Sequence, residues 1–521
     1  MKKIFCSLLV TLGFVFSAPA QKTSATASKG EVIYHVFQRS FYDSNGDLQG
    51  DLNGLKSKLD YLQDLGITSI LLLPLYEADC YHNYFASDFE IIDREFGTMN
   101  DYISLVRDIH RRGMKIYLDM ETQYVTEKHL WWKDAVGNPK SVYSNYILFD
   151  DEAHTKPATI IFDLHELNSY DGSKIKITTV NLKSKEVLDY NIKLFSFFAD
   201  PNKDGKFDDG ADGFRLDHAM DHLDNKPTLT NLFQEFWSPL VLAVKKVNPK
   251  IKFVAEQANW ADYGFDYFEK ANVDRMFGFG LQQAILSFDK QNLVRNADTI
   301  LGMTPAGKEQ IIFIENHDID RSASTINDPA KERVAAALCL LMGGIPSIYY
   351  GQELGMQGKG GFGIYGSTDG NDIPRREAFE WYKTGKGKGM ATWYKNTGPW
   401  WDKTYVKPND GISLEEERKD MGSLYNFYKR LIHLRQGNAA LSTGKYQSIT
   451  NDNPRVFSFA RYGARSVLVV VNLSGENERA TLSIKNEQYK PLFGEIRVRQ
   501  NTVSLKPYEI GVWSIQGQAH E

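Results

Sequence analysis

The sequence predicts an α/β protein: a (β/α)8 barrel with a domain inserted after the third strand and a C-terminal antiparallel β-sandwich. Asp217 and Glu256 each close an apolar run and are 39 positions apart, and Asp318 closes another run 62 positions after Glu256. A barrel of about 250 residues repeats every 31 residues or so, and these spacings approximate one and two repeats. Asp119 closes a further run 98 positions before Asp217, which leaves roughly 67 residues for an insertion between neighbouring strands. The four runs span residues 115–119, 213–217, 253–256 and 311–318.

The remaining barrel strands are predicted from similar apolar runs, and the C-terminal domain from a change of pattern. Alternating apolar residues from about position 447, such as 456–459 and 467–471, indicate a small antiparallel sandwich. The expected domains are a barrel over 31–122 and 192–440, an inserted domain over 123–191 and a C-terminal domain over 441–521. Further barrel strands are expected at 32–37, 68–73, 274–277 and 344–350, and a closing helix at 424–434.

The N-terminus has the pattern of a secretory signal peptide. Two lysines precede a mostly apolar run, and Ser17-Ala18-Pro19-Ala20 supplies small residues for cleavage. We therefore expect residues 1–20 to be removed on export to the periplasm or the medium, and residues 21–30 to form a flexible leader. No other run reaches the roughly 18 apolar residues of a membrane span.

Composition excludes some classes of partner. The net charge of −5 over 521 residues provides no basic surface for nucleic acid. Beyond the signal peptide only Cys80 and Cys339 remain, and Cys339 falls in an apolar helical pattern that predicts a core thiol. The oligomeric state is not predicted.

The stretch Gly213-Phe214-Arg215-Leu216-Asp217 carries the strongest chemical signal. Residues two apart on a strand point to the same side, so Arg215 and Asp217 share one environment. An adjacent guanidinium lowers the pKa of a carboxyl and keeps it ionised, which suits a nucleophile. A structural ion pair fits the same spacing, so function depends on the partner carboxylates.

Two loops have alternating oxygen side chains of the kind that hard cations bind. The first follows the first strand and the second precedes the central strand; solvated polar turns are the alternative for both. The second follows the start of a calcium loop but has Ala211 where the bidentate glutamate belongs. The candidate ligands are Asp43, Asn45, Asp47, Gln49 and Asp51 in the first loop, and Asp200, Asn202 and Asp204 in the second.

Three motifs resemble the conserved regions of the α-amylase superfamily of glycoside hydrolases and occur in the same order along the chain. They are G-F-R-L-D at Asp217, A-E at Glu256 and N-H-D at Asp318. The resemblance runs from about Val32 to the C-terminus. It implies that Asp217 is the nucleophile, Glu256 the general acid/base and Asp318 a third carboxylate that stabilises the distorted sugar. It also implies an inserted B domain after Asp119 and a structural Ca²⁺ in the first oxygen-rich loop. The implied substrate-binding residues are His82, Tyr84, Arg215, His222 and His317.

Several positions depart from the family pattern. The segment Tyr81-His82-Asn83-Tyr84 resembles the family's Y-H-G-Y, with Asn83 in place of glycine. Phe85 stands where exo-acting α-glucosidases of the family have an aspartate, which favours a site open at both ends. Gln123 and Tyr124 replace the family's Asn-His pair.

The resemblance implies a retaining α-glycosidase that hydrolyses α-1,4-glucosidic bonds in starch-derived maltooligosaccharides through a covalent glycosyl-aspartate intermediate. An α-glucosidase or a transglycosylase of the same superfamily would use the same three carboxylates, and a non-catalytic glycan-binding member would usually lose one. The sequence does not decide between α-1,4 and α-1,6 bonds, or between endo and exo action.

Overall fold

A computed structural model describes residues 30–161, 164–169, 173–257, 259–361, 369–395, 404–484, 488–496 and 498–516. The predicted signal peptide and all but the last residue of the predicted leader lie outside the described residues.

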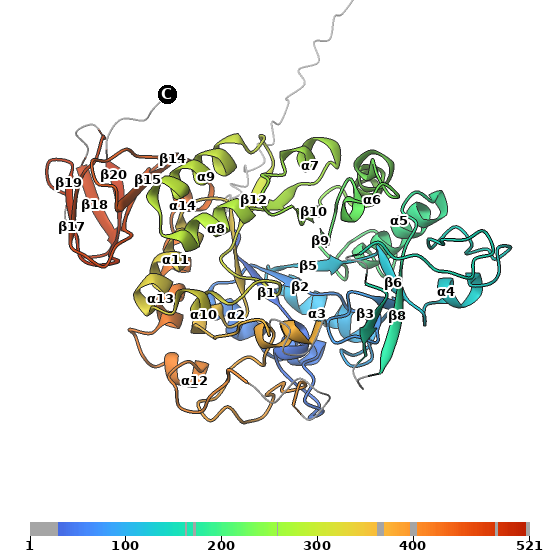
Figure 1. Cartoon of the computed structure of the whole chain (residues 1–521). Coiled ribbons are helices and arrows are strands. Elements are labelled where there is room, and N and C mark those ends of the chain that lie inside the picture. Colours follow the sequence, from blue (N-terminus) through green and yellow to red (C-terminus); the bar gives the residue numbers. More distant parts are fainter. Residues whose placement is uncertain are drawn as a thin grey trace, which may run out of the picture.

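Eight parallel strands close into a barrel in the order β1-β13-β12-β11-β10-β9-β5-β2, which confirms the predicted fold class (Figure 1). Closure is direct, because Ile33 of the first strand pairs with Ser347 of the last. The register places Asp119 beside Arg215 and Arg215 beside Val254 on three neighbouring strands. The strands are β1 (Ile33–Val36), β2 (Ser69–Leu72), β5 (Lys115–Met120), β9 (Gly213–Leu216), β10 (Lys252–Ala255), β11 (Arg275–Phe277), β12 (Glu309–Ile312) and β13 (Ile345–Tyr349).

Helices surround the barrel, and several begin with a side-chain cap (Figure 1). Thr98 and Asp101 form a capping box at the start of α3, and Asp328 accepts the Ala330 N–H at the start of α11. Cys339 lies buried in α11, which confirms the predicted core thiol. The main helices are α1 (Leu52–Ser57), α2 (Leu59–Leu65), α3 (Met99–Arg111), α5 (Lys185–Ala199), α6 (Ser238–Val247), α7 (Phe265–Lys270), α8 (Phe279–Ser287), α9 (Lys290–Met303), α10 (Ser322–Ile326), α11 (Pro329–Leu341), α12 (Leu414–Glu417), α13 (Leu424–Gln436) and α14 (Ala439–Thr443).

The insertion between β5 and β9 forms a sheet together with the loop that follows β2. This sheet has the order β3-β4-β6-β8-β7 and lies at the right in Figure 1. Its first two strands come from residues before the predicted inserted domain, so the sheet joins two separate segments of the chain. Its elements are β3 (Tyr76–Ala78), β4 (Ala86–Ile92), β6 (Tyr124–Thr126), β7 (Glu166–Asn168) and β8 (Lys174–Thr179), with α4 (Leu130–Ala135) between β6 and β7.

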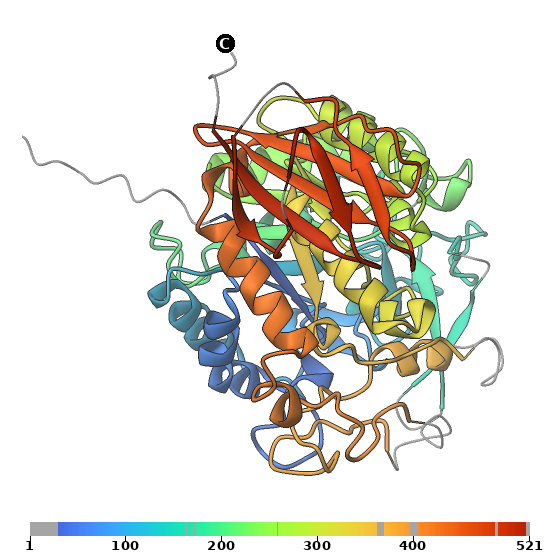
Figure 2. The same ribbon diagram turned by 90° about the vertical axis from the view of Figure 1, so that its left-hand side faces the viewer.

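The C-terminal residues form a five-stranded antiparallel sheet, β14-β15-β16-β20-β18, and a two-stranded sheet, β17-β19. Figure 2 shows the larger sheet lying across helices of the barrel. Arg461 of β15 donates to the Leu341 carbonyl at the end of α11, which ties the sheet to the barrel. The strands are β14 (Lys445–Ser448), β15 (Val456–Tyr462), β16 (Val467–Asn472), β17 (Glu478–Thr481), β18 (Gln488–Phe493), β19 (Thr502–Leu505) and β20 (Ile510–Gln516).

A buried ion pair closes the end of the barrel at which the strands begin. The Glu31 carboxylate accepts hydrogen bonds from Arg275 Nη2 at 2.8 Å, from the Tyr117 hydroxyl at 2.8 Å and from the Ser69 hydroxyl at 2.7 Å. Arg275 is 3% exposed and also contacts Glu309 at the protein surface. The charged groups in this plug therefore satisfy one another.

Candidate active site

A cavity of about 530 Å³ opens at the C-terminal ends of the barrel strands. Barrel enzymes build their sites at this end because the loops that follow each strand converge there. The cavity brings together six of the predicted site residues: His82, Tyr84, Asp217, Glu256, His317 and Asp318. Phe85, Glu121, Tyr124, Trp260, Asp369, Asp372 and Arg376 also line it.

Arg215 lies at the centre of the acidic groups, with only 2% of its side chain exposed. Its Nη1 lies 2.7 Å from Asp119 Oδ2 and also contacts Asp217 Oδ1, and its Nη2 lies 3.0 Å from Glu256 Oε2. Charge-assisted bonds from a rigid, planar guanidinium fix several acceptors at once. One arginine therefore sets the spacing of the two carboxyls predicted to carry the chemistry.

The two carboxyls have opposite pKa shifts. Burial alone would raise the pKa of Asp217, but Arg215 and hydrogen bonds from Glu121 and Glu256 hold it below its ordinary value. Burial raises the pKa of Glu256 to about 8, and the negative charges of Asp217 and Asp318 add to the rise despite Arg215. At neutral pH one group is ionised and its neighbour protonated, as an acid and a nucleophile require.

Asp318 forms a third acidic group with its own cationic partner. Arg376 Nη2 lies 3.3 Å from Asp318 Oδ1, and His317 Nε2 lies 3.2 Å from Asp318 Oδ2. The Asp318 side chain is 30% exposed, against 15% for Asp217 and 10% for Glu256. It is therefore the most accessible of the three to a molecule in the cavity.

Tyr84 and His82 form one wall of the cavity. The Tyr84 hydroxyl lies 2.7 Å from both Asp119 Oδ2 and His317 Nε2, and its ring is nearly parallel to the His317 ring. His82 Nδ1 accepts the Tyr84 N–H, and His82 Nε2 lies 3.0 Å from Asp369 Oδ2. Asn83 has a φ of 62°, a left-handed conformation that glycine adopts freely and asparagine tolerates. This conformation explains how asparagine substitutes for the family glycine.

Gln123 and Tyr124 support the loop that carries Asp217. The Gln123 amide donates to the Asp217 carbonyl at 2.6 Å, and the Tyr124 hydroxyl donates to Asp224 Oδ2 at 2.7 Å. Asp224 in turn lies 3.1 Å from His218 Nε2. Gln123 and Tyr124, which depart from the family pattern, therefore hold the segment that carries Asp217 through backbone and side-chain contacts.

His222 is not among the residues that line the cavity. Its side chain is 61% exposed and lies 3.5 Å from Asp221. The chain turns sharply at His218, whose φ is 46°, so strand alternation no longer determines direction four residues later. This geometry does not support the predicted substrate contact.

Four further residues line the cavity that the sequence pattern did not predict as site residues: Glu121, Asp369, Asp372 and Arg376. Arg376 and the two aspartates lie in the loop after β13, within and next to the 3-10 turn Asp369–Arg375. Their contacts with His82 and Asp318 depend on the path of that loop. Glu121 reaches Asp217 because β5 pairs with β9 so that Asp119 lies beside Arg215. That pairing register is not visible in the sequence alone.

In the first predicted metal loop, side-chain oxygens accept hydrogen bonds from backbone N–H groups two residues further along the chain. All the candidate metal ligands in this loop are oxygen atoms. Asp43 accepts the Asn45 N–H, Asn45 the Asp47 N–H and Asp47 the Gln49 N–H. The Gln49 side chain bonds to Arg39, so only its backbone carbonyl is available to a cation. Asp51 caps α1 by accepting the Gly54 N–H. This oxygen-only donor set fits Ca²⁺.

In the second predicted metal loop, Asp200 Oδ2 accepts the Gly205 N–H and Asn202 accepts the Asp204 N–H. Asp200 Oδ1 is buried without a hydrogen-bond partner, which a bound cation would supply. In the described ranges, however, no three His, Cys, Asp or Glu side chains gather as a metal site. Any cation in either loop therefore depends partly on amide and backbone oxygens.

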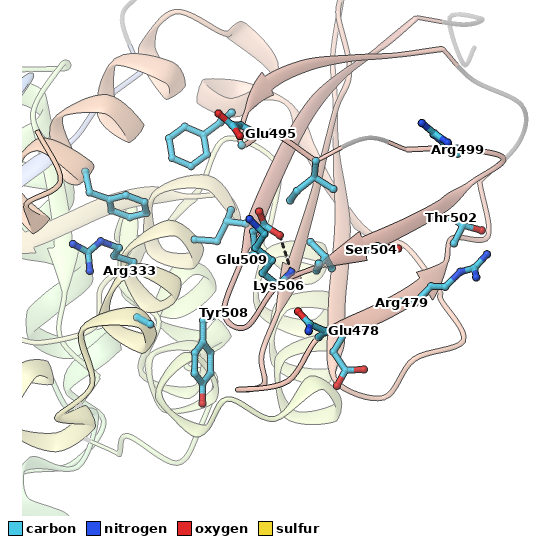
Figure 3. Close-up of a pocket in the computed structure, with 18 of the residues that line it drawn as sticks. Arg333, Glu478, Arg479, Glu495, Arg499, Thr502, Ser504, Lys506, Tyr508 and Glu509 are labelled. Atoms are coloured by element: carbon cyan, nitrogen blue, oxygen red, sulfur yellow. Dashed lines mark hydrogen bonds between the residues drawn. The ribbon is translucent and has the colours of Figure 1, made fainter.

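A larger hollow of about 1260 Å³ lies beside the C-terminal sheets (Figure 3). Two of its acidic groups are already engaged: Glu478 pairs with Arg455, and Glu509 accepts the Lys506 N–H. It contains none of the three predicted catalytic carboxyls. We therefore place the candidate active site in the barrel cavity.

None of the helices in the described parts of the chain has the length and apolar character that crossing a membrane requires.

Comparison with known proteins agrees with this architecture. The alpha amylase catalytic domain model matches residues 35–444. Alpha-amylase 3 of Dictyoglomus thermophilum is 29% identical over 493 residues, covering 92% of each chain. A probable oligo-1,6-glucosidase of Bacillus subtilis is 27% identical, covering 93% of this chain and 98% of that protein. The crystal structure of an alpha-amylase from H. orenii superposes with a TM-score of 0.77 at 27% identity, covering 94% of this chain and all of that one. The chain with the Asp217, Glu256 and Asp318 cavity therefore belongs to the alpha-amylase family and is a glycosidase.

Proposed function

We propose that the protein hydrolyses α-1,4-glucosidic bonds of starch-derived maltooligosaccharides with net retention of the α-anomer. The observation that carries the proposal is Arg215, which holds an ionised Asp217 and a protonated Glu256 in one buried site. Retaining glycosidases need this pair, a carboxylate nucleophile and a carboxylic acid, close together.

In the first step Asp217 attacks the anomeric carbon while Glu256 gives its proton to the departing glycosidic oxygen. The bond to the leaving sugar breaks and an ester to Asp217 forms. In the second step the Glu256 carboxylate takes a proton from water, the water oxygen bonds to the anomeric carbon, and Asp217 is released as a carboxylate. Both groups return to their initial protonation states.

The remaining cavity residues would bind the sugar that reacts. Tyr84 and His317 present parallel rings beside Asp318, and Asp318 and His82 present polar groups to the hydroxyls. Contacts that tighten as the sugar ring flattens favour the transition state over the bound substrate, and only such contacts raise the rate.

The two-step retaining mechanism is tested by identifying which anomer of the product forms first. NMR during hydrolysis of maltopentaose should show the α-anomer before mutarotation. Asp217→Asn should abolish turnover in a folded protein. Glu256→Gln should accumulate the glycosyl-enzyme from a substrate whose activated leaving group needs no proton. A β-anomer as first product would mean direct attack by water and would refute the assignment of Asp217.

The proposed cleavage mode is endo, because Phe85 lines the cavity in place of the aspartate that anchors a chain end. A mixture of oligomer lengths should form in the first minutes of reaction. The competing assignment is an exo-acting α-glucosidase or a transglycosylase. It is favoured by Asp369, whose Oδ1 is buried without a partner at the cavity wall. Glucose as the sole early product, lost in Asp369→Asn, would establish the exo assignment.

We also propose that Ca²⁺ stabilises the fold through Asp43, Asn45, Asp47, Asp51 and the Gln49 carbonyl, and at a second site through the Asp200, Asn202 and Asp204 loop. A ligand held only by the native state raises the melting temperature by mass action. Chelation should lower the melting temperature, and Asp47→Ala should reduce the response. If wild type and Asp47→Ala respond identically to chelation, the first loop is a polar turn.

A further inference from the structure

Glu121 is a buried acid in contact with the proposed nucleophile. It follows the end of β5 by one residue, is 2% exposed and lines the active-site cavity. Its Oε1 accepts the Gln123 N–H at 2.6 Å, and its carboxyl group is hydrogen-bonded to the carboxyl of Asp217. Two carboxyl groups bond in this way only when one of them has a proton.

The surroundings decide which carboxyl has the proton. Asp217 contacts Arg215, whereas none of the ion pairs in the described part of the chain includes Glu121. The charged groups that face Glu121 are Asp119 and Asp217, both acidic. Burial and these charges raise the pKa of Glu121 well above its ordinary value. The proton therefore stays on Glu121.

The other groups packed around this pair do not change the assignment. The Tyr76 hydroxyl bonds to the Glu121 main chain, and the Tyr124 hydroxyl is directed to Asp224. The other titratable groups that face Asp217 are Glu256, His218, Tyr84 and Asp318. None of them supplies a cation to Glu121.

We infer that Glu121 is a neutral hydrogen-bond donor to the nucleophile and speeds breakdown of the glycosyl-enzyme by stabilising Asp217 as the departing carboxylate. This inference depends on the proposed function. While Asp217 is esterified, its acyl oxygen is a weak acceptor. When the bond between the anomeric carbon and Asp217 breaks, the electron pair returns to the carboxylate and the bond from Glu121 strengthens.

Such a bond acts mainly in the second step. A donor whose bond tightens as charge develops lowers the barrier of the step in which the charge develops. In the first step the same donor stabilises the attacking carboxylate and does not help. Glu121 keeps its proton throughout, because water gives its proton to Glu256. Loss of the donor should therefore slow the release of sugar from Asp217 more than its attachment.

The test compares Glu121→Gln with Glu121→Leu. Glutamine imitates the neutral acid, since its carbonyl can accept from Gln123 and its amide can donate to Asp217; leucine removes the donor. With an aryl maltoside that has a good leaving group, deglycosylation limits kcat. In Glu121→Leu, kcat should fall about tenfold or more, the range for hydrogen bonds to charged groups. KM should fall in parallel and kcat/KM should change little, because the glycosyl-enzyme accumulates.

Two further readouts separate this role from a structural one. The acid limb of the pH profile of kcat/KM should move to higher pH in Glu121→Leu, because ionised Asp217 loses a donor, and stay in place in Glu121→Gln. Glu121→Gln should keep kcat within about threefold of wild type. Wild-type kcat and an unmoved limb in Glu121→Leu would overturn the inference.

The inference stays testable if the leucine variant does not fold, because a hundredfold loss in a folded Glu121→Gln would show that an ionised Glu121 is needed. A failure of the proposed function is distinguishable, since wild type would then give the β-anomer or Asp217→Asn would retain turnover.

Discussion

The buried plug at the N-terminal end of the barrel predicts how stability depends on pH. Glu31→Gln keeps the shape of the side chain but removes the charge that faces Arg275. Burial alone would raise the pKa of Glu31, but Arg275 outweighs it and lowers the pKa from 4.5 to about 2. The ionised form is therefore favoured in the folded protein by about 3 kcal/mol.

The direction of the pH dependence of stability, and the pH range in which it occurs, follow from this pKa shift. Because the folded pKa is depressed, the stabilisation is present above pH 4.5 and is lost as the pH falls toward 2. At the entropy of unfolding typical of a chain this long, 3 kcal/mol corresponds to a lower melting temperature of about 3 °C at pH 7. The difference in melting temperature between wild type and Glu31→Gln should narrow to about three fifths of that value at pH 3.5.

Glu309→Gln provides the matched control. Glu309 contacts the same arginine at 2.9 Å, but its side chain is 46% exposed, so its removal should cost less than about 1 kcal/mol. Melting of the three proteins is followed by differential scanning calorimetry at a fixed scan rate from pH 7 to 3.5. Equal shifts for both variants, or a Glu31→Gln deficit that does not change with pH, would refute this account of the plug.

Three predictions concern the active site. The alkaline limb of kcat/KM should lie near pH 8, because activity is lost as protonated Glu256 ionises. Initial rates measured across the pH range check this prediction. An alkaline limb that persists in Glu256→Gln with an activated substrate would contradict it. Arg215→Lys should lower kcat/KM at least a hundredfold, since a single ammonium cannot contact three carboxyl groups as the planar guanidinium does. A loss under tenfold in steady-state assays would show that charge alone suffices. Gln123→Leu should lower kcat about tenfold through the lost bond to the Asp217 carbonyl, whereas an unchanged kcat would make that bond dispensable.

The barrel strands could be predicted closely because their signal is local. The run 68–73 predicts β2 (Ser69–Leu72) within a residue at each end, since buried parallel strands are continuous apolar runs. The run 311–318 is less accurate, because β12 spans Glu309–Ile312 and the chain leaves the sheet before Asn316. Asp217 and Glu256 could be identified because each directly follows a strand. Asp318 lies beyond the end of β12 at Ile312 and was identified through the Asn-His-Asp motif.

Contacts between distant loops could not be predicted in this way. Asp369 reaches His82 across 287 residues, and Arg376 reaches Asp318 across 58. Neither contact leaves a periodic trace in the sequence. The bond between Glu121 and Asp217 is also hidden, because the two acids follow different strands and come together only through the pairing of β5 with β9.

The sheet shared by the loop after β2 and the insertion after β5 limits how this enzyme can be recombined with its relatives. Ala86 of β4 pairs with Val125 of β6, and Tyr124 of β6 pairs with Thr179 of β8. A chimera that exchanges residues 123–191 alone would cut the sheet between β4 and β6 and leave both new edges without their native partners. The exchangeable module is therefore discontinuous. Residues 74–97 and 121–191 have to move together, so that the Tyr76 hydroxyl keeps its bonds to the Glu121 main chain.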